Sequence, residues 1–167
     1  MDFKPDVDEK DLVVPYFEDA SNEDGVIGYT TQKSQKKLKA EITAGFGRLG
    51  GSVVGFQSGK FANRYGFRIE FTFAGVPGRM DVAALPIKKE TESKVDKAKR
   101  HALYSVQKRL EAEYSTMLVM PGDVPLMPYM LNDSGKTILE MMRESGQLPA
   151  LPEKVEEEII EGEFYES

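Results

Sequence analysis

The ten residues RYGFRIEFTF, from Arg64 to Phe73, constrain the fold more than any other stretch of the chain. Every second residue is apolar, namely Tyr65, Phe67, Ile69, Phe71 and Phe73. The residues between them are mostly polar and include two arginines. This period of two indicates a β-strand that buries one face and exposes the other. Such a strand needs neighbouring strands and a layer that covers its apolar face.

The flanking segments predict two partner strands. Residues 52–57 are apolar and predict a short first strand, followed by a loop at 58–63. Residues 74–78, AGVPG, predict a turn, because glycine and proline favour chain reversal. Residues 79–87 predict a third strand, which Pro86 ends or confines to a sheet edge.

Two segments predict helices from apolar residues spaced by three and four. In residues 30–49 these are Leu38, Ile42, Phe46 and Leu49, and Gly50-Gly51 ends the helix. In residues 91–117 they are Val95, Ala98, Ala102, Val106, Leu110 and Tyr114, with Thr91 or Ser93 as the cap. The predicted fold is α+β: a three-stranded antiparallel sheet, a preceding helix and a long basic helix packed on one face.

The chain also predicts segments outside this core. Residues 1–29 predict an acidic N-terminal arm, 30–151 a single α+β domain with its core at 32–117, and 152–167 an acidic disordered tail. Residues 118–151 form an extension rich in methionine and proline, which fills the core or forms a subunit interface. A short helix is expected at 134–144, capped by Asp133 or Ser134 and ended by Gly146.

Composition excludes several classes of protein. The 167 residues include no cysteine, which excludes disulfides and thiolate metal sites. No apolar run reaches the roughly 18 residues of a membrane span, and the acidic start MDFKPDVDEK lacks the apolar core of a signal peptide. We therefore expect a soluble, cytoplasmic protein.

No catalytic motif stands out. There is one histidine, His101, which is expected on the surface of a basic helix, and there is no nucleophile motif or phosphate-binding loop. We expect no catalytic residue, no metal and no cofactor. One enzymatic alternative is that Asp81, with Glu70 opposite and Lys88 beyond, resembles the core of metal-dependent restriction-type nucleases. Pro86 occupies the place of the second acidic residue of that pattern.

Charge is strongly segregated along the chain. Residues 1–30 hold 2 Lys/Arg and 9 Asp/Glu, residues 31–110 hold 17 and 6, and residues 111–167 hold 3 and 13. This pattern predicts a polyanion-binding core between acidic arms, or a folded domain between solvated tails. Six cations lie in one window of 13 residues that runs from the third strand into the long helix, namely Lys88, Lys89, Lys94, Lys97, Lys99 and Arg100. Phosphate contacts are expected from this window and from the arginines of the two hairpin strands, and base stacking from Tyr65. The predicted nucleic-acid-binding residues are Arg64, Tyr65, Arg68, Arg79, Lys88, Lys89, Lys94, Lys97 and Arg100.

The hairpin FRIEFTFAGVPGRMDVAALPIK, which leads into KVDKAKRHALYSVQKRL, resembles the core of Rad52-type single-strand annealing proteins over about residues 32–115. The resemblance implies a homo-oligomeric ring that lays single-stranded DNA in a basic groove between hairpin and helix. Such a groove would be lined by Arg64, Arg68, Arg79, Lys94, Lys97 and Arg100. The order helix, three strands, helix also resembles the double-stranded-RNA-binding domain, whose last helix begins with a lysine pair that is not matched in position here.

The predicted function is non-enzymatic binding or annealing of single-stranded DNA in recombination or phage DNA processing. The alternative is a non-catalytic protein-interaction subunit whose basic face meets an acidic partner. The acidic tail resembles the C-termini of phage recombination proteins and is predicted to bind a protein partner or to fold back on the basic core. Its predicted contact residues are Ile159, Ile160, Phe164 and Tyr165.

Overall fold

The computed structural model describes residues 14–21, 25–26, 28 and 31–146. Within this range the elements are η1 (Phe17–Asp19), α1 (Gln35–Arg48), β1 (Gly51–Phe61), β2 (Arg64–Phe73), β3 (Val76–Ala83), α2 (Glu92–Val119), η3 (Met127–Tyr129) and α3 (Ile138–Glu144). The predicted α+β class and the order helix, three strands, long helix are confirmed.

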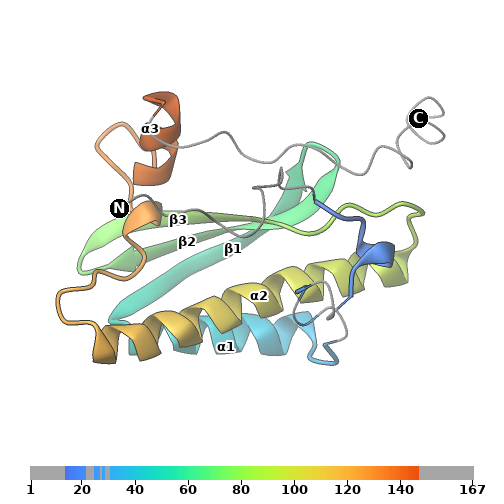
Figure 1. Cartoon of the computed structure of the whole chain (residues 1–167), viewed down its shortest axis with the longest axis horizontal. Helices are drawn as coiled ribbons and strands as arrows, with labels where there is room; N and C mark the ends of the chain where they lie inside the picture. Colours follow the sequence, from blue (N-terminus) through green and yellow to red (C-terminus); the bar gives the residue numbers. More distant parts are fainter. Residues whose placement is uncertain (1–13, 22–24, 27, 29–30, 147–167) are drawn as a thin grey trace, which may run out of the picture.

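The three strands form one antiparallel sheet in the order β1-β2-β3, and α1 and α2 cover one of its faces (Figure 1). The two helices run in the same direction. Near their starts, the Gln35 side chain donates a hydrogen bond of 2.7 Å to Asp96. Ten residues further along α1, Gly45 lies against Leu110. Among the described residues, the other face of the sheet is approached by only one α-helix, the short α3 (Ile138–Glu144).

The core lies between β2 and the two helices. Phe67, Ile69 and Phe71 are buried, while Tyr65 and Phe73 at the strand ends are half-buried, which confirms the apolar face predicted from period two. Each such buried side chain stabilises the fold by roughly 1.5–3 kcal/mol through removal of apolar surface from water. The helices contribute Leu38, Ile42, Phe46, Leu103, Val106 and Leu110.

The predicted loop at 58–63 is wrong, because β1 continues to Phe61. Lys60 pairs with Tyr65 and Phe61 with Arg64, so that only Ala62 and Asn63 form the reversal. Ser58, Gly59 and Lys60 are polar or small and lie in an edge strand, where burial imposes no apolar alternation. A bulge between Val53 and Gly55 leaves Val54 exposed.

The third strand is Val76–Ala83 rather than 79–87, and the turn before it is shorter than predicted. Phe73 pairs with Val76, so the loop holds only Ala74 and Gly75. Both have positive φ, 51° and 79°. Two left-handed residues form the two-residue hairpin turn that suits the right-handed twist of paired strands. The strand therefore starts three residues earlier than the Pro-Gly signal suggested.

The helix caps are side-chain hydroxyls. Thr91 accepts a hydrogen bond from the Lys94 backbone at 3.2 Å, which confirms one of the two predicted caps for the long helix. The predicted helix at 134–144 is wrong at its start, since α3 begins at Ile138 with Thr137 as its cap. The Glu140 carboxylate accepts a hydrogen bond from the Thr137 backbone N–H and completes a capping box.

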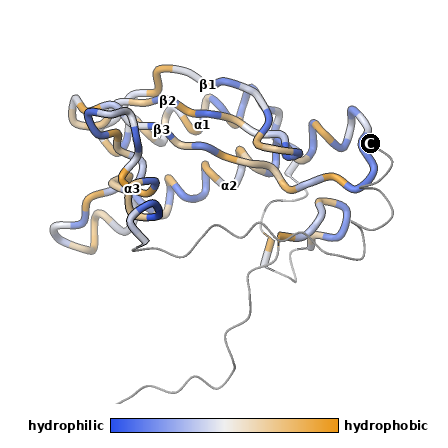
Figure 2. The backbone as a smooth tube through the Cα atoms, turned by 90° about the horizontal axis from the view of Figure 1, so that it is seen from above, coloured by the Kyte–Doolittle hydropathy of each residue, from blue (hydrophilic) through white to orange (hydrophobic). Residues whose placement is uncertain are grey.

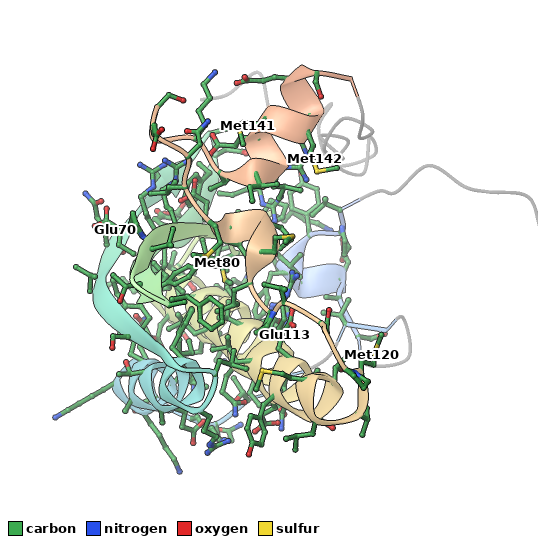
Figure 3. The ribbon with its side chains drawn as sticks, turned by 90° about the vertical axis from the view of Figure 1, so that its left-hand side faces the viewer. Glu70, Met80, Glu113, Met120, Met141 and Met142 are labelled. Carbon is green, nitrogen blue, oxygen red and sulfur yellow. The ribbon has the colours of Figure 1, made fainter. Side chains whose placement is uncertain are left out.

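The extension packs only in part. Leu126 is buried in the main core, and Met117 and Met130 pack against it. Met130 also bridges to Gly78 at the β3 edge. Met141 and Met142 lie on α3, on the side of the sheet opposite α1 and α2, whereas Met120 lies by the end of α2 (Figures 1 and 3).

The hydropathy of the residues along the backbone agrees with this partial packing of the extension. Hydrophilic and hydrophobic residues alternate along α2 and the strands, and a hydrophobic stretch lies in the loop that follows α2 (Figure 2). Among the described residues, no helix combines the length and apolar character that crossing a membrane requires.

Gly66 and Gly59 face each other across β1 and β2 and provide a matched test of packing. A Cβ at Gly66 would come within 2.2 Å of the Val82 carbonyl oxygen, whereas one at Gly59 would have nothing within 4 Å. We expect Gly66→Ala to lower the free energy of unfolding by about 2 kcal/mol, and Gly59→Ala to change it little or raise it slightly. Urea unfolding of both variants checks this. Equal stability of the two would contradict the described sheet register.

Candidate nucleic-acid interface

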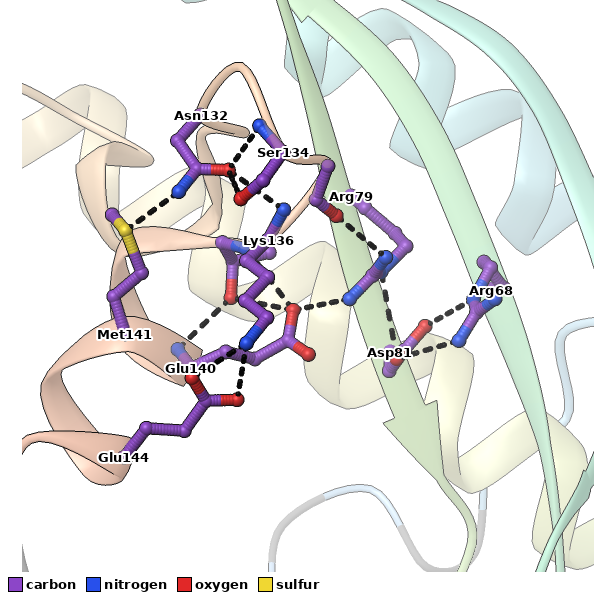
Figure 4. Close-up of polar contacts among 11 residues, drawn as sticks. Arg68, Arg79, Asp81, Asn132, Ser134, Lys136, Glu140, Met141 and Glu144 are labelled. Atoms are coloured by element: carbon purple, nitrogen blue, oxygen red, sulfur yellow. Dashed lines mark hydrogen bonds and ion pairs between the residues drawn. The ribbon is translucent and has the colours of Figure 1, made fainter.

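Two predicted arginines lie on the face of the sheet opposite α1 and α2, and they bind carboxylates of their own chain. Arg68 donates hydrogen bonds of 2.8 and 3.1 Å to the two oxygens of Asp81, directly opposite on β3. Arg79 lies 3.7 Å from Asp81, binds Glu140 of α3 and donates to the Gly135 carbonyl at 3.3 Å (Figure 4). Hydrogen bonding to Asp81 raises the pKa of Arg68. The positive charges of both arginines are therefore largely neutralised.

The same network bears on the nuclease alternative. Both oxygens of Asp81 accept hydrogen bonds from Arg68, and Glu70 pairs in register with Arg79, not with Asp81. No group of three or more potential metal ligands occurs among the residues that the structure describes.

Arg64 has a structural role at the end of the hairpin. Its guanidinium donates hydrogen bonds to the carbonyls of Ala84 at 2.8 Å and Ala83 at 3.0 Å. Burial lowers the pKa of Arg64. The side chain thus fixes the point where the chain leaves β3, and its donors are directed at backbone instead of solvent.

Lys88 and Lys94 contact the acidic segment before α1. The Lys94 ammonium lies 3.2 Å from the Glu18 carboxylate, and the Lys88 ammonium lies 3.2 Å from that of Asp19. Glu18 also accepts backbone hydrogen bonds from Lys88 at 2.9 Å and Lys89 at 2.8 Å. Burial alone raises the pKa of Glu18, but these hydrogen bonds outweigh it, and the net pKa is lowered. Part of the predicted acidic arm is thus bound to the core.

The remaining predicted cations differ in whether a carboxylate pairs with them. Arg100 pairs with Asp96 at 2.9 Å and donates to the Thr31 carbonyl. Lys89 and Lys97 have exposed side chains, and within the described ranges no carboxylate lies within ion-pair distance of either ammonium. The nine predicted residues therefore do not form one free basic groove.

The prediction of a surface histidine is wrong. His101 is buried, with its ring centroid 6.4 Å from that of Phe17. Phe17 belongs to the predicted acidic N-terminal arm, and it packs against Ala98 and Ala102 of the same helix. The helical pattern alone could not show that a distant aromatic residue covers this position.

Three other lysines converge on aromatic rings beside β1, and we call them the lysine cluster: Lys39 of α1, Lys60 of β1 and Lys99 of α2. Lys39 lies 5.1 Å from the Phe67 ring centroid and 5.8 Å from that of Phe56. Lys60 and Lys99 lie 4.5 and 5.6 Å from the centroid of Tyr65. Lys99 also donates to the Ser58 hydroxyl at 3.1 Å. Such placement over ring faces is the geometry of cation–π attraction.

Within the described part of the chain, no carboxylate lies within 4.0 Å of a cluster ammonium. Sequence reasoning selected Tyr65 and counted Lys99 in the basic window at 88–100, but it did not select Lys39 or Lys60. The signal for Lys60 was available, because a hairpin turning at Ala62-Asn63 places Lys60 opposite Tyr65. Lys39 and Lys99 required the packing of both helices.

A shallow hollow adjoins the lysine cluster at the start of α2. Its lining includes Tyr65 and Lys99 but also Glu90, Glu92 and Asp96. The Tyr65 hydroxyl hydrogen-bonds to Glu90. These carboxylates repel an anion on that side, so the cluster favours anions on its other side, toward β1.

The tail residues Ile159, Ile160, Phe164 and Tyr165 lie outside the described residues. No protein-family model, curated protein or solved structure matches this chain. What the site does is therefore inferred from its own residues.

Glu140 links the arginine network to the α3 cap and makes that cap sensitive to pH. The backbone hydrogen bond from Thr137 is the main cause that lowers the pKa of Glu140, and Arg79 lowers it further. A lowered pKa stabilises the fold above the unfolded value of about 4.3, and this contribution is lost as pH falls through the folded value. We expect the unaltered protein to melt at a higher temperature than Glu140→Gln at pH 7, and the difference to shrink as the pH falls below about 4. A difference in melting temperature that is constant across this range would contradict an ionised Glu140 at the cap.

Proposed function

We propose that this protein binds single-stranded nucleic acid through the lysine cluster. The observation that carries the proposal is that three ammonium groups, from α1, β1 and α2, converge beside aromatic rings. By contrast, most of the cations in the predicted set are paired with carboxylates. Because they have no ion-pair partner among the described residues, these lysines can bind phosphates without first losing a carboxylate contact.

The neighbouring rings favour single strands. Tyr65 and Phe56 are half-buried and keep exposed surface beside the ammonium groups, whereas Phe67 is only 1% exposed. An aromatic ring next to a phosphate-binding cation can stack on an unpaired base, which a duplex does not present. Function in DNA annealing, recombination or phage DNA processing remains a prediction from the resemblance.

The residues proposed here to bind nucleic acid differ from those that the sequence predicted. Arg64, Arg68 and Arg79 hold the hairpin and the extension together, and their donors are engaged within the chain. Lys89 and Lys97 stay candidates for additional phosphate contacts because their ammonium groups are exposed. Of the predicted set, Tyr65 lies against two lysines of the cluster, Lys60 and Lys99.

Neutralising a cluster lysine should weaken binding and reduce its salt dependence. We expect Lys39→Gln and Lys99→Gln each to weaken binding of a fluorescent oligothymidylate several-fold at about 50 mM salt. Each should also lower the slope of log affinity against log salt by about 0.7, the value for one phosphate contact on a single strand. Fluorescence anisotropy across a salt series, with a duplex of the same length in parallel, measures both quantities.

Arg68→Gln is the control for this experiment, because it removes the same charge from a residue that is already paired with Asp81. It should leave affinity and slope near those of the unaltered protein. If Arg68→Gln and Lys99→Gln lost equal affinity, the loss would reflect the change in net charge and not a contact made by the lysine cluster. Absence of binding by the unaltered protein at about 50 mM salt would refute the proposed function.

A second candidate function, a protein-interaction subunit, is favoured by exposed apolar side chains around the end of α2. Within ten residues the chain exposes Leu118, Val119, Met120, Val124 and Met127. Exposed apolar side chains gathered in this way mark interaction surfaces. A second copy of this chain is the partner to test first, since the predicted homo-oligomer needs a surface that contacts another copy.

If this surface joins two copies, the double variant Leu118→Gln/Val119→Gln should be a monomer under conditions where the unaltered chain is larger. Light scattering during gel filtration, with and without oligothymidylate, measures the mass. Val54→Gln is the matched control, because Val54 is an equally exposed valine on β1. A monomeric unaltered chain, or an oligomer insensitive to the double variant, would rule out this surface as a self-interface.

A further inference from the structure

The connection between β3 and α2 holds a carboxylate in a geometry that suits a phosphate. The two oxygens of Glu18 accept hydrogen bonds from the successive backbone N–H groups of Lys88 and Lys89, at 2.9 and 2.8 Å. The Lys94 ammonium lies 3.2 Å from the second oxygen. Successive N–H donors with an adjacent cation form a concave anion-binding seat that accepts carboxylates and phosphates alike.

We propose that Glu18 masks this anion seat and competes for it with a phosphate of the bound nucleic-acid strand. The inference rests on the proposed function, to which it adds a regulatory contact. Glu90, the residue after Lys89, hydrogen-bonds to Tyr65, so the seat and the lysine cluster share the same short connection. A strand that extends from the cluster past Tyr65 toward Lys89 would meet the seat, and its phosphates would there gain the backbone donors that offset the repulsion by Glu90.

The segment that carries Glu18 can stay in place while its carboxylate leaves. Phe17 is buried against Ala84, Ala98 and Ala102, and its backbone N–H donates to the Pro86 carbonyl at 2.8 Å. This anchor does not depend on the Glu18 side chain. Release of the seat thus requires rotation of one side chain, and the anchored carboxylate remains nearby to compete again.

Asp19 reinforces the mask. Its carboxylate lies 3.2 Å from the Lys88 ammonium, so two adjacent acidic side chains neutralise two of the predicted phosphate-binding lysines. These ion pairs are partly exposed and weaken as salt rises. A nucleic-acid strand supplies several phosphates at once, which favours it over a single carboxylate once it is held at the lysine cluster.

Glu18→Gln removes the competing charge and keeps one carbonyl oxygen for the backbone donors. We expect it to tighten oligothymidylate binding several-fold at about 50 mM salt and to steepen the salt slope by about 0.7 to 1.4, for one or two added phosphate contacts. The charge-matched control is Glu144→Gln. It breaks an exposed ion pair between Glu144 at the end of α3 and Lys136, which precedes α3. It should leave the salt slope unchanged.

Two further measurements keep the test decisive. Adding Lys94→Gln to Glu18→Gln should cancel most of the gained affinity, because it removes the cation of the seat. Inorganic phosphate provides a readout without nucleic acid: it should shift the NMR amide signals of Lys88 and Lys89 in Glu18→Gln and not in Glu144→Gln. Unchanged dispersion of the remaining amide signals confirms that each variant is folded.

The outcomes separate this inference from the proposed function. If the unaltered protein binds oligothymidylate but Glu18→Gln behaves as Glu144→Gln does, the mask is refuted and the function stands. If no variant binds oligothymidylate, the proposed function fails, and with it the role of the mask in nucleic-acid binding. In that case phosphate-induced shifts at Lys88 and Lys89 would still establish the seat, and their absence would refute it too.

Discussion

The packing of the apolar face of β2 against α1 and α2 determines the rest of this structure. Phe71 meets Phe46 with ring centroids 4.7 Å apart, and Phe67 and Ile69 are buried in the same layer. Because both helices cover one face, polar residues such as Arg68 and Asp81 are left on the other face, where they pair with each other. The same packing brings the starts of α1 and α2 beside the end of β1, where the lysine cluster forms.

Charge counting and charge pairing lead to different conclusions about the basic middle of the chain. The excess of lysine and arginine over residues 31–110 is real, but partners distant in sequence neutralise much of it. Lys88 pairs with Asp19 and Arg79 with Glu140, across 69 and 61 residues. A local window of sequence cannot contain such contacts, so it overestimates the positive surface along β3 and the start of α2.

The fold was predictable because its main elements carry strong local patterns. Alternation in β2 and three-four spacing in both helices arise from burial of one face, which a sequence records directly. The errors lie where burial gives no signal. The end of β1 was assigned to a loop, the turn at Ala74-Gly75 was extended to residue 78, and the cap at Thr137 was placed too early. Of the candidate site, Tyr65 and the basic window that contains Lys99 were predicted. The convergence of Lys39, Lys60 and Lys99 was not, because it requires three elements to be packed together.

The two edges of the sheet are not equivalent. At β3, Leu131 donates a backbone hydrogen bond to the Pro77 carbonyl, so the extension occupies part of that edge. No described strand pairs with the free side of β1, where the bulge at Val53–Gly55 breaks the regular ladder and Lys60 adds a charge. Among the described residues, the β1 edge is therefore the more open of the two to growth of the sheet by another strand. Bulges and charged edge residues are known to discourage indiscriminate strand addition, so a peptide that extends this sheet would have to match both its register and its charge.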